Sequence, residues 1–223
     1  MTLTLSNWEK RWGGLYLLLQ MFLVPYGAAL VCAAFSISSN TTVNLLGFFT
    51  NAALAVVFFR QLLLRSLQNF RRGSAIGAVL MGFCLYWLLN QVVLTLILAI
   101  KPDFSNINDT SINAMIDESP VLMSLAVVFA APLAEECLFR GWLFTGLSQR
   151  SLPLAYCVTT VCFAAVHILG YIGTYDALTL VLCTVQYLVP GATLCWVCRR
   201  ADSLCAPLLL HIFINTIALF TTR

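Results

Sequence analysis

Charged residues are scarce in this sequence. Asp, Glu, Lys and Arg make up 9% of its 223 residues, against about 25% in a typical soluble domain, whereas hydrophobic residues make up 61%. This composition excludes an ordinary soluble globule, a disordered chain, a coiled coil and collagen. It predicts an all-α, polytopic bundle of membrane helices.

A surplus of positive charge is also missing. The net charge is +3, and the cations are scattered, so no nucleic-acid partner is expected. The nine cysteines are an odd number, and most lie in apolar runs, where Cys behaves as a small hydrophobic residue. The pair Cys195 and Cys198 forms a lone CxxC motif without a second pair, which is weak support for zinc.

Uncharged runs between the clustered charges are long enough for membrane helices, since a span needs about 20 residues. The run from Trp12 to Phe59 is too long for one helix, and the polar residues 36–42 divide it. We therefore expect about seven spans, at residues 14–35, 43–64, 73–100, 120–147, 152–172, 177–198 and 203–221. A cleavable signal peptide is the alternative for the first run, but about 22 apolar residues exceed the usual signal length.

The Lys and Arg residues predict the orientation of these spans. With the N-terminus in the cytoplasm, nine Lys and Arg residues of the loops and helix ends fall inside, and only Lys101 and Arg223 fall outside. The loop 101–119, with its four acidic residues, then lies outside. We expect a multi-pass protein of the cell (inner) membrane with its C-terminus outside. Residues 1–119 and 120–223 are expected to form the two parts of one membrane domain.

Three charged residues interrupt the fourth apolar run, where a charge at the helix centre costs about 2.5–3.5 kcal/mol. Glu136 and Arg140 are four residues apart, so they share a helix face and can pair. Glu135 points about 100° away and stays free, as a general base must. The alternative for Glu136 and Arg140 is a structural ion pair at the membrane interface.

The only two histidines also lie in apolar runs. His211 shares a helix face with Asn215, four residues later, and His167 lies in the fifth expected span, at residues 152–172. A histidine in a span is commonly a core residue, but two with an amide partner favour one polar site with Glu135. Such a site can activate water and stabilise an oxyanion. By helix length, Glu135 and His211 fit the cytoplasmic half, whereas His167 is expected to lie deeper.

Three motifs in this order resemble those of the CPBP family, the CAAX prenyl proteases and bacteriocin-processing enzymes also called the Abi family of intramembrane endopeptidases. The motifs are Glu135-Glu136-x-x-x-Arg140, Phe163-x-x-x-His167 and His211-x-x-x-Asn215. The resemblance covers about residues 120–220. Residues 1–119 match only as membrane helices.

The resemblance implies a glutamate-dependent endopeptidase whose cavity opens toward the cytoplasm. Glu135 would activate water with the help of His167, His211 and Asn215 would stabilise the oxyanion, and Glu136 with Arg140 would be a supporting ion pair. No cofactor is expected, but zinc on two His and a Glu is kept as an alternative. The expected substrate is a peptide or membrane-protein segment in the bilayer, with or without a lipid group.

Two other classes of function are compatible with buried Glu and His residues. A transporter or proton-relay protein uses such residues along an ion path, although no inverted repeat is visible in the sequence. A non-catalytic membrane scaffold could use the same fold. Loss of function in a Glu135→Gln variant separates the enzyme from the scaffold.

Overall fold

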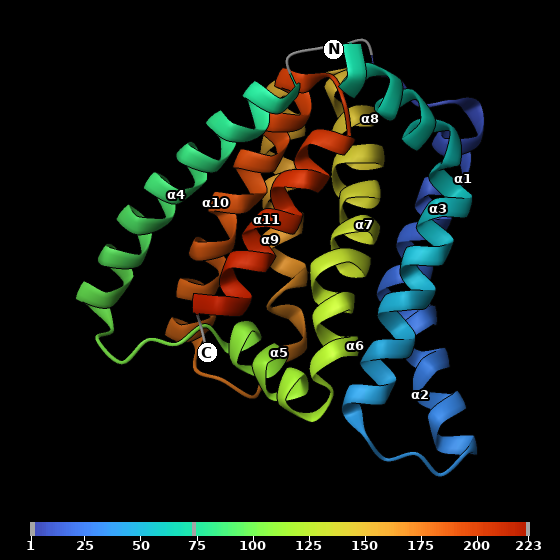
Figure 1. Cartoon of the computed structure of the whole chain (residues 1–223). Helices are drawn as coiled ribbons and strands as arrows, with labels where there is room; N and C mark the ends of the chain where they lie inside the picture. Colours follow the sequence, from blue (N-terminus) through green and yellow to red (C-terminus); the bar gives the residue numbers. More distant parts are fainter. Residues whose placement is uncertain (1–2, 73–74, 222–223) are drawn as a thin grey trace.

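The computed structural model describes residues 3–72 and 75–221, which form helices and contain no strand (Figure 1). Within these ranges, six helical segments are long and apolar enough to cross a membrane, and a shorter apolar helix of 17 residues ends the bundle. The predicted all-α membrane bundle is confirmed. The predicted start of the third span, at residues 73–74, lies outside the described residues.

The first four long segments correspond to the first four expected spans. They are α1 (Asn7–Leu18) continued by the π-helical η1 (Leu19–Leu23) and α2 (Val24–Ala34); α3 (Asn40–Arg72); α4 (Ala75–Ile100); and α6 (Pro120–Leu125) continued by η2 (Ala126–Ala130), α7 (Ala131–Glu136), η3 (Cys137–Phe144) and α8 (Thr145–Ser148). The remaining ones are α9 (Leu152–Val166) with the 3₁₀ turn η4 (Leu169–Tyr171), α10 (Ala177–Ala201) and the shorter α11 (Cys205–Thr221).

Local sequence explains where several of these helices begin. Ser6 and Glu9 form a capping box at α1. Ser151 and Asp176 accept hydrogen bonds from the first turns of α9 and α10. The polar segment that was expected to divide the first long run does so, since α2 ends at Ala34 and α3 begins at Asn40.

Residues 101–119 were expected to be a loop, but they contain the helix α5 (Ile107–Glu118). Asn106 caps it by accepting hydrogen bonds from the backbone of Asn108 and Asp109. Because α5 is rich in Asn, Asp, Ser and Thr, its intrinsic helix propensity is low and its apolar pattern is weak. Its contacts with α10, described below, stabilise it instead.

The buried apolar core joins residues of α1, α3, α4, the fourth span, α9, α10 and α11. Within it, α10 packs closely against α4, α9 and α11. Glycines permit two of these close approaches. A Cβ atom at Gly82 of α4 would collide with Val197 of α10. A Cβ atom at Gly191 of α10 would lie within 3.3 Å of the Thr160 backbone of α9. The second contact holds α9, whose C-cap residue is His167, close against α10.

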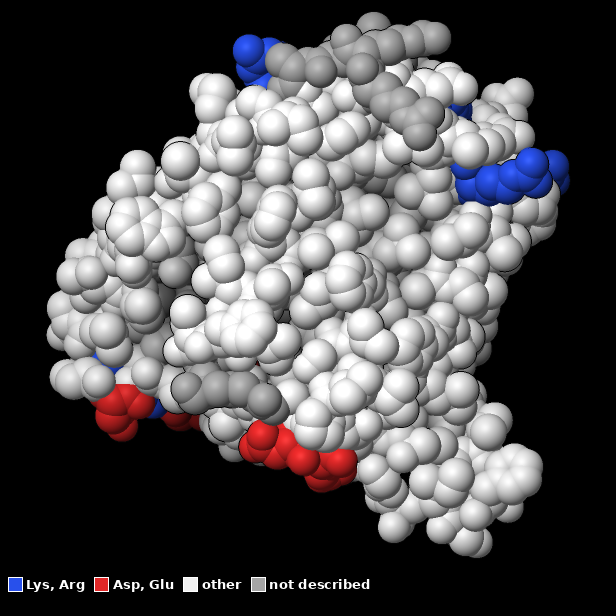
Figure 2. All heavy atoms as spheres, viewed as in Figure 1, with Lys and Arg blue, Asp and Glu red and all other residues white. Residues whose placement is uncertain are grey.

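Charges separate toward the two ends of the bundle (Figure 2). The basic end, where α1 begins and α3 and α10 end, carries Lys10, Arg11, Arg60, Arg65, Arg150, Arg199 and Arg200. The acidic end, where α5 lies, carries Asp103, Asp109, Asp117, Glu118 and Asp176, together with Lys101. At the basic end, Glu9 is buried and pairs with Arg65. This separation has the form that the sequence predicts for an oriented membrane protein.

Candidate active site

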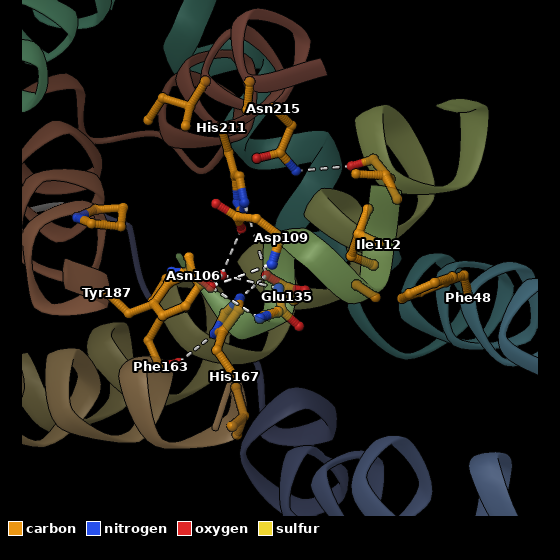
Figure 3. Close-up of a pocket in the computed structure, with 18 of the residues that line it drawn as sticks. Phe48, Asn106, Asp109, Ile112, Glu135, Phe163, His167, Tyr187, His211 and Asn215 are labelled. Atoms are coloured by element: carbon orange, nitrogen blue, oxygen red, sulfur yellow. Dashed lines mark hydrogen bonds and ion pairs between the residues drawn. The ribbon is translucent and has the colours of Figure 1, made fainter. Parts of the chain in front are cut away.

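Glu135 lies between the two histidines. Its Oε2 atom is 3.9 Å from His167 Nε2 and 3.9 Å from His211 Nε2 (Figure 3). The Glu135 side chain is 19% exposed, and Oε2 has no hydrogen-bond partner among the described residues. The structure thus brings together three side chains from α7, the end of α9 and α11, as the sequence predicted. A separation of 3.9 Å is too long for a direct hydrogen bond and suits a bridging water molecule.

The expectation that His167 lies deeper than His211 is wrong. Ser203 and Leu204, just before α11, hydrogen-bond to Ser66, at 2.7 and 3.1 Å. Ser66 lies six residues before the end of α3, so α11 begins about 9 Å inside that end of the bundle. Because α11 begins inside the bundle, His211 lies farther from the basic end than its place in the sequence suggests, at about the depth of His167.

The fourth span departs from α-helical geometry on both sides of Glu135. The π-helical segments η2 and η3 flank the short α7, and their i→i+5 hydrogen bonds rotate the following side chains relative to a regular helix. Such π-bulges occur frequently at functional sites. Sequence spacing alone could not reveal them.

Glu136 points away from the cavity into the protein interior. Its Oε1 atom accepts hydrogen bonds from Arg140 Nη1 and His211 Nδ1, each at 2.8 Å. The side chains of Glu136 and Arg140 are both 0% exposed, so the pair is a buried one and not an interfacial one. The contact with His211 was not predicted, and it joins the ion pair directly to the site.

Arg140 has further contacts that explain how a buried guanidinium is tolerated. Its Nη2 atom donates to the Gly191 carbonyl at 3.0 Å, and its guanidinium lies 4.2 Å from the ring centre of Phe163. The close approach permitted by Gly191 therefore also supplies Arg140 with an acceptor. Arg140 connects the fourth span to α9 and α10 as well as to Glu136.

His167 is held in one orientation. Its Nδ1 atom donates to the Phe163 carbonyl at 2.7 Å, because a carbonyl can only accept. Its ring stacks on Tyr187 of α10, with ring centres 4.1 Å apart and planes inclined by 22°. In the neutral form of this ring, Nε2, which faces Glu135, carries no proton.

Asn215 is fixed by an irregularity in the fourth span. Its Nδ2 atom donates to the Val127 carbonyl at 2.9 Å. In η2 the backbone N–H of Ala131 donates five residues back, to Ala126. The next residue, Pro132, has no N–H, so the Val127 carbonyl lacks the partner that this pattern would supply. Asn215 satisfies it and keeps its second amide hydrogen for another acceptor.

Replacing Pro132 with Ala is expected to lower activity while the protein stays folded. Ala supplies an N–H that competes with Asn215 for the Val127 carbonyl and releases the Asn215 amide. Since a misplacement of about 1 Å can cost about 10²-fold in rate, we expect a loss of up to about 10²-fold. Cleavage rates of the purified protein measure it. Pro153→Ala, in the first turn of α9, is the matched control, and equal rates for the two variants would contradict this account.

A cavity of about 380 Å³ adjoins Glu135, His167, His211 and Asn215. On the side toward the acidic end, α5 and its N-cap residue Asn106 form the wall, with Asn108, Asp109, Ile112, Asn113 and Ile116 contributed by the helix. Among the described residues, those that line the cavity include many amides and two carboxylates, those of Glu135 and Asp109, but no Lys or Arg. Amides offer both donors and acceptors and are suited to a peptide backbone.

Polar contacts connect α5 to α10 next to His167. Asn106 Nδ2 donates to Gln186 Oε1 at 2.9 Å, and Tyr187 Oη donates to Asp109 Oδ1 at 3.1 Å. Burial raises the pKa of Asp109, while the hydrogen bond from Tyr187 and the nearby His167 lower it. These residues could not be found from the sequence, because they belong to no recognisable motif. The residues that contact each other are about 80 positions apart in the chain.

In this structure, Glu135 lies too far from His167 and His211 for the three side chains to bind one metal ion. Among the described residues, no group of three or more His, Cys, Asp or Glu side chains has the arrangement of a metal site. Zn–N and Zn–O bonds of about 2.1 Å would place tetrahedral ligands roughly 3.4 Å apart, closer than the 3.9 Å measured at Glu135.

The multiple apolar helices are those of an integral, multi-pass membrane protein, and they surround a cluster of Glu135, His167, His211 and Asn215. Residues 117–217 match the family model described as type II CAAX prenyl endopeptidase Rce1-like. This match confirms the resemblance to the CPBP family that the three motifs indicated, and it supports an intramembrane endopeptidase in general. No curated protein and no solved structure matches the chain significantly.

Proposed function

We propose that the protein is a glutamate-dependent intramembrane endopeptidase in which Glu135 activates a water molecule. The observation that carries the proposal is the unpaired, largely buried Oε2 of Glu135, which faces both His167 and His211 at 3.9 Å. A buried carboxylate oxygen without a donor is costly unless a ligand or water satisfies it. The family match supports the reaction class.

In the proposed reaction, Glu135 removes a proton from a water molecule whose other hydrogen donates to His167 Nε2. The water oxygen attacks the peptide carbonyl carbon, and the carbonyl oxygen becomes an oxyanion. Glu135 then delivers its proton to the peptide nitrogen as the C–N bond breaks. The products are a carboxylic acid and an amine, and the carboxylate of Glu135 is regenerated.

His211 and Asn215 are placed to stabilise the oxyanion. His211 Nδ1 donates to Glu136, so Nε2 can donate only when the ring is an imidazolium. The carboxylates of Glu135 and Glu136 lie on either side of the ring, 3.9 Å from Nε2 and 2.8 Å from Nδ1. The second amide hydrogen of Asn215 is the other donor. Glu136 and Arg140 thus position His211 in addition to balancing each other's charge.

Replacing Asn215 with Ala is expected to reduce cleavage about 10²–10³-fold, the usual effect of removing one oxyanion donor. Most of the loss should appear in kcat, because the oxyanion forms only in the transition state. Asn44→Ala is the matched control, since Asn44 is exposed and donates only to the Asn40 carbonyl. A loss of less than about threefold would remove Asn215 from this role.

Cleavage by the purified protein is expected to survive strong chelators, because Glu135 itself supplies the base. The zinc-dependent alternative predicts loss of activity with a chelator and recovery when zinc is returned. That result would make Glu135, His167 and His211 metal ligands. Cleavage rates with and without chelator, at constant pH, separate the two mechanisms.

The proposed substrate is a peptide or a membrane-protein segment, with or without an attached lipid. The cavity of about 380 Å³ has the size of a small-ligand site and can hold a few residues around the scissile bond. Its apolar wall includes Met21, Phe48, Ile112, Ile116 and Leu219, and this wall suits apolar side chains. The transporter and scaffold alternatives have no comparable supporting observation.

A further inference from the structure

We propose that Gln20 and Asn51 form a substrate subsite that accepts hydrogen bonds from the backbone of the bound peptide. This inference rests on the proposed endopeptidase function and deepens it. The N-terminal helices, which carry none of the three motifs, thereby supply part of the substrate site. The proposal follows from the position and burial of these two amide side chains and from the missing partners of their oxygens.

The cavity next to Glu135 extends to the N-terminal helices. Its lining there consists of Gln20 and Met21 of η1, Pro25 of α2, and Phe48 and Asn51 of α3. Phe48 marks this side of the cavity in Figure 3. Among the described residues, Gln20 and Asn51 are the polar side chains that these elements contribute to the lining.

Both amides are buried without a partner for their oxygen. Gln20 is 7% exposed and Asn51 is 9% exposed. Among the described residues, neither Gln20 Oε1 nor Asn51 Oδ1 has a hydrogen-bond partner, and Glu135 Oε2 is the third such buried oxygen in the cavity lining. A buried, unpaired carbonyl oxygen is costly. These oxygens therefore indicate a ligand that supplies hydrogen-bond donors.

Tyr16 holds the two amides on the same side of the cavity. Its Oη atom donates to the backbone carbonyl of Asn51 at 3.1 Å, and its ring packs edge-on against Phe59, with ring centres 5.2 Å apart. Gln20 follows Tyr16 by four residues, so both side chains project from the same face of the first span. That face is directed toward the part of α3 that carries Asn51. Gln20 also lies in the π-helical η1, and such segments are frequent at functional sites.

A side-chain amide matches the chemistry of a peptide group. It offers one carbonyl acceptor and two N–H donors, and a half-turn of the group exchanges their positions. Hydrogen bonds to the main chain supply affinity for an extended peptide, and adjoining pockets select its side chains. Met21, Pro25 and Phe48 form an apolar surface beside the neutral amides. The ligand of this subsite is therefore an extended peptide segment with an apolar side chain.

Melting temperatures of the purified protein test whether the two amides serve folding or binding. Gln20→Leu and Asn51→Leu remove an unpartnered amide and keep a similar volume, so each should melt as the unchanged protein does or slightly higher. Asn106→Leu is the matched comparison, because Asn106 is 8% exposed and lines the same cavity, but its amide bonds to Gln186 and to the first turn of α5. It should melt lower. An equal fall in all three variants, or failure of Gln20→Leu and Asn51→Leu to fold, overturns the proposal.

Cleavage kinetics test the binding role. The probe is a synthetic quenched peptide that spans the site cut in cell membranes by the unchanged protein and not by Glu135→Gln. Gln20→Leu and Asn51→Leu should each raise KM about twofold to tenfold with kcat nearly unchanged, because each loses one hydrogen bond to the substrate in the ground and transition states alike. Gln91→Leu, which removes an exposed amide of α4 outside the cavity lining, should keep both values.

Peptides that are N-methylated at one backbone nitrogen at a time identify the donor. At one position, the methyl group should raise KM of the unchanged protein by the same factor and add nothing to KM of Gln20→Leu or of Asn51→Leu. Additive effects at every position, or an unchanged KM in both variants, overturn the subsite. If no peptide is cut by the unchanged protein and spared by Glu135→Gln, the endopeptidase function itself fails, and the subsite fails with it.

Discussion

Glu135→Gln is expected to abolish peptide cleavage while the protein remains folded. Gln keeps the shape of Glu but cannot accept a proton at neutral pH, and Glu135 makes no ion pair closer than 3.9 Å that the change would break. Loss of a general base costs about 10²–10⁴ in rate, or roughly 3–5.5 kcal/mol of barrier. Cleavage rates of the purified protein and its melting temperature in detergent measure the two effects.

Asp103→Asn is the matched control for this change, because Asp103 is an exposed carboxylate at the acidic end. It should cleave at the rate of the unchanged protein. Cleavage by Glu135→Gln within about tenfold of the unchanged protein would exclude Glu135 as the base. An ion flux that depends on Glu135 would favour the transporter, and unchanged biological function would favour the scaffold.

Arg140→Ala is expected to destabilise the protein strongly. Removing one partner of a buried ion pair strands the other charge, which typically costs about 3–5 kcal/mol. Here the stranded group is Glu136, whose side chain is 0% exposed. The variant also loses the hydrogen bond to Gly191 and the contact with Phe163. The yield of folded protein and the melting temperature should both fall.

Two further variants make this expectation specific. Lys101→Ala breaks a partly exposed pair with Asp176, and such pairs contribute at most about 1 kcal/mol, so it should melt almost normally. The double change Glu136→Gln with Arg140→Met removes both charges and should recover stability relative to Arg140→Ala. It should not recover cleavage, because His211 loses its anionic partner. Normal melting of Arg140→Ala would show that the pair is not structurally important.

The sequence predicted most of the bundle because burial in a membrane leaves a strong, local signal. Uncharged runs located the long helices, and the polar residues 36–42 marked the break between the first two. Helix α5 was missed, since it depends on Asn106 and Asp109 meeting Gln186 and Tyr187 of a distant helix. Local composition carries no sign of those contacts.

In the candidate site, too, the local contacts could be predicted from the sequence and the long-range contacts could not. The i,i+4 spacing of Glu136 and Arg140 predicted their contact, and charges within an apolar run drew attention to Glu135. The bond between Glu136 and His211, the stacking of Tyr187 on His167 and the link from Asn215 to Val127 could not be predicted. They depend on the recessed start of α11 and on π-helical turns, which are set by tertiary packing.

The most direct test of the central claim compares the peptides and protein fragments in membranes of cells that express the unchanged protein or Glu135→Gln at equal levels. If Glu135 is the base of an endopeptidase, an intact substrate accumulates with Glu135→Gln, and its two cleavage fragments appear only with the unchanged protein. Identical fragments in both membranes, at equal abundance, would contradict a glutamate-dependent protease.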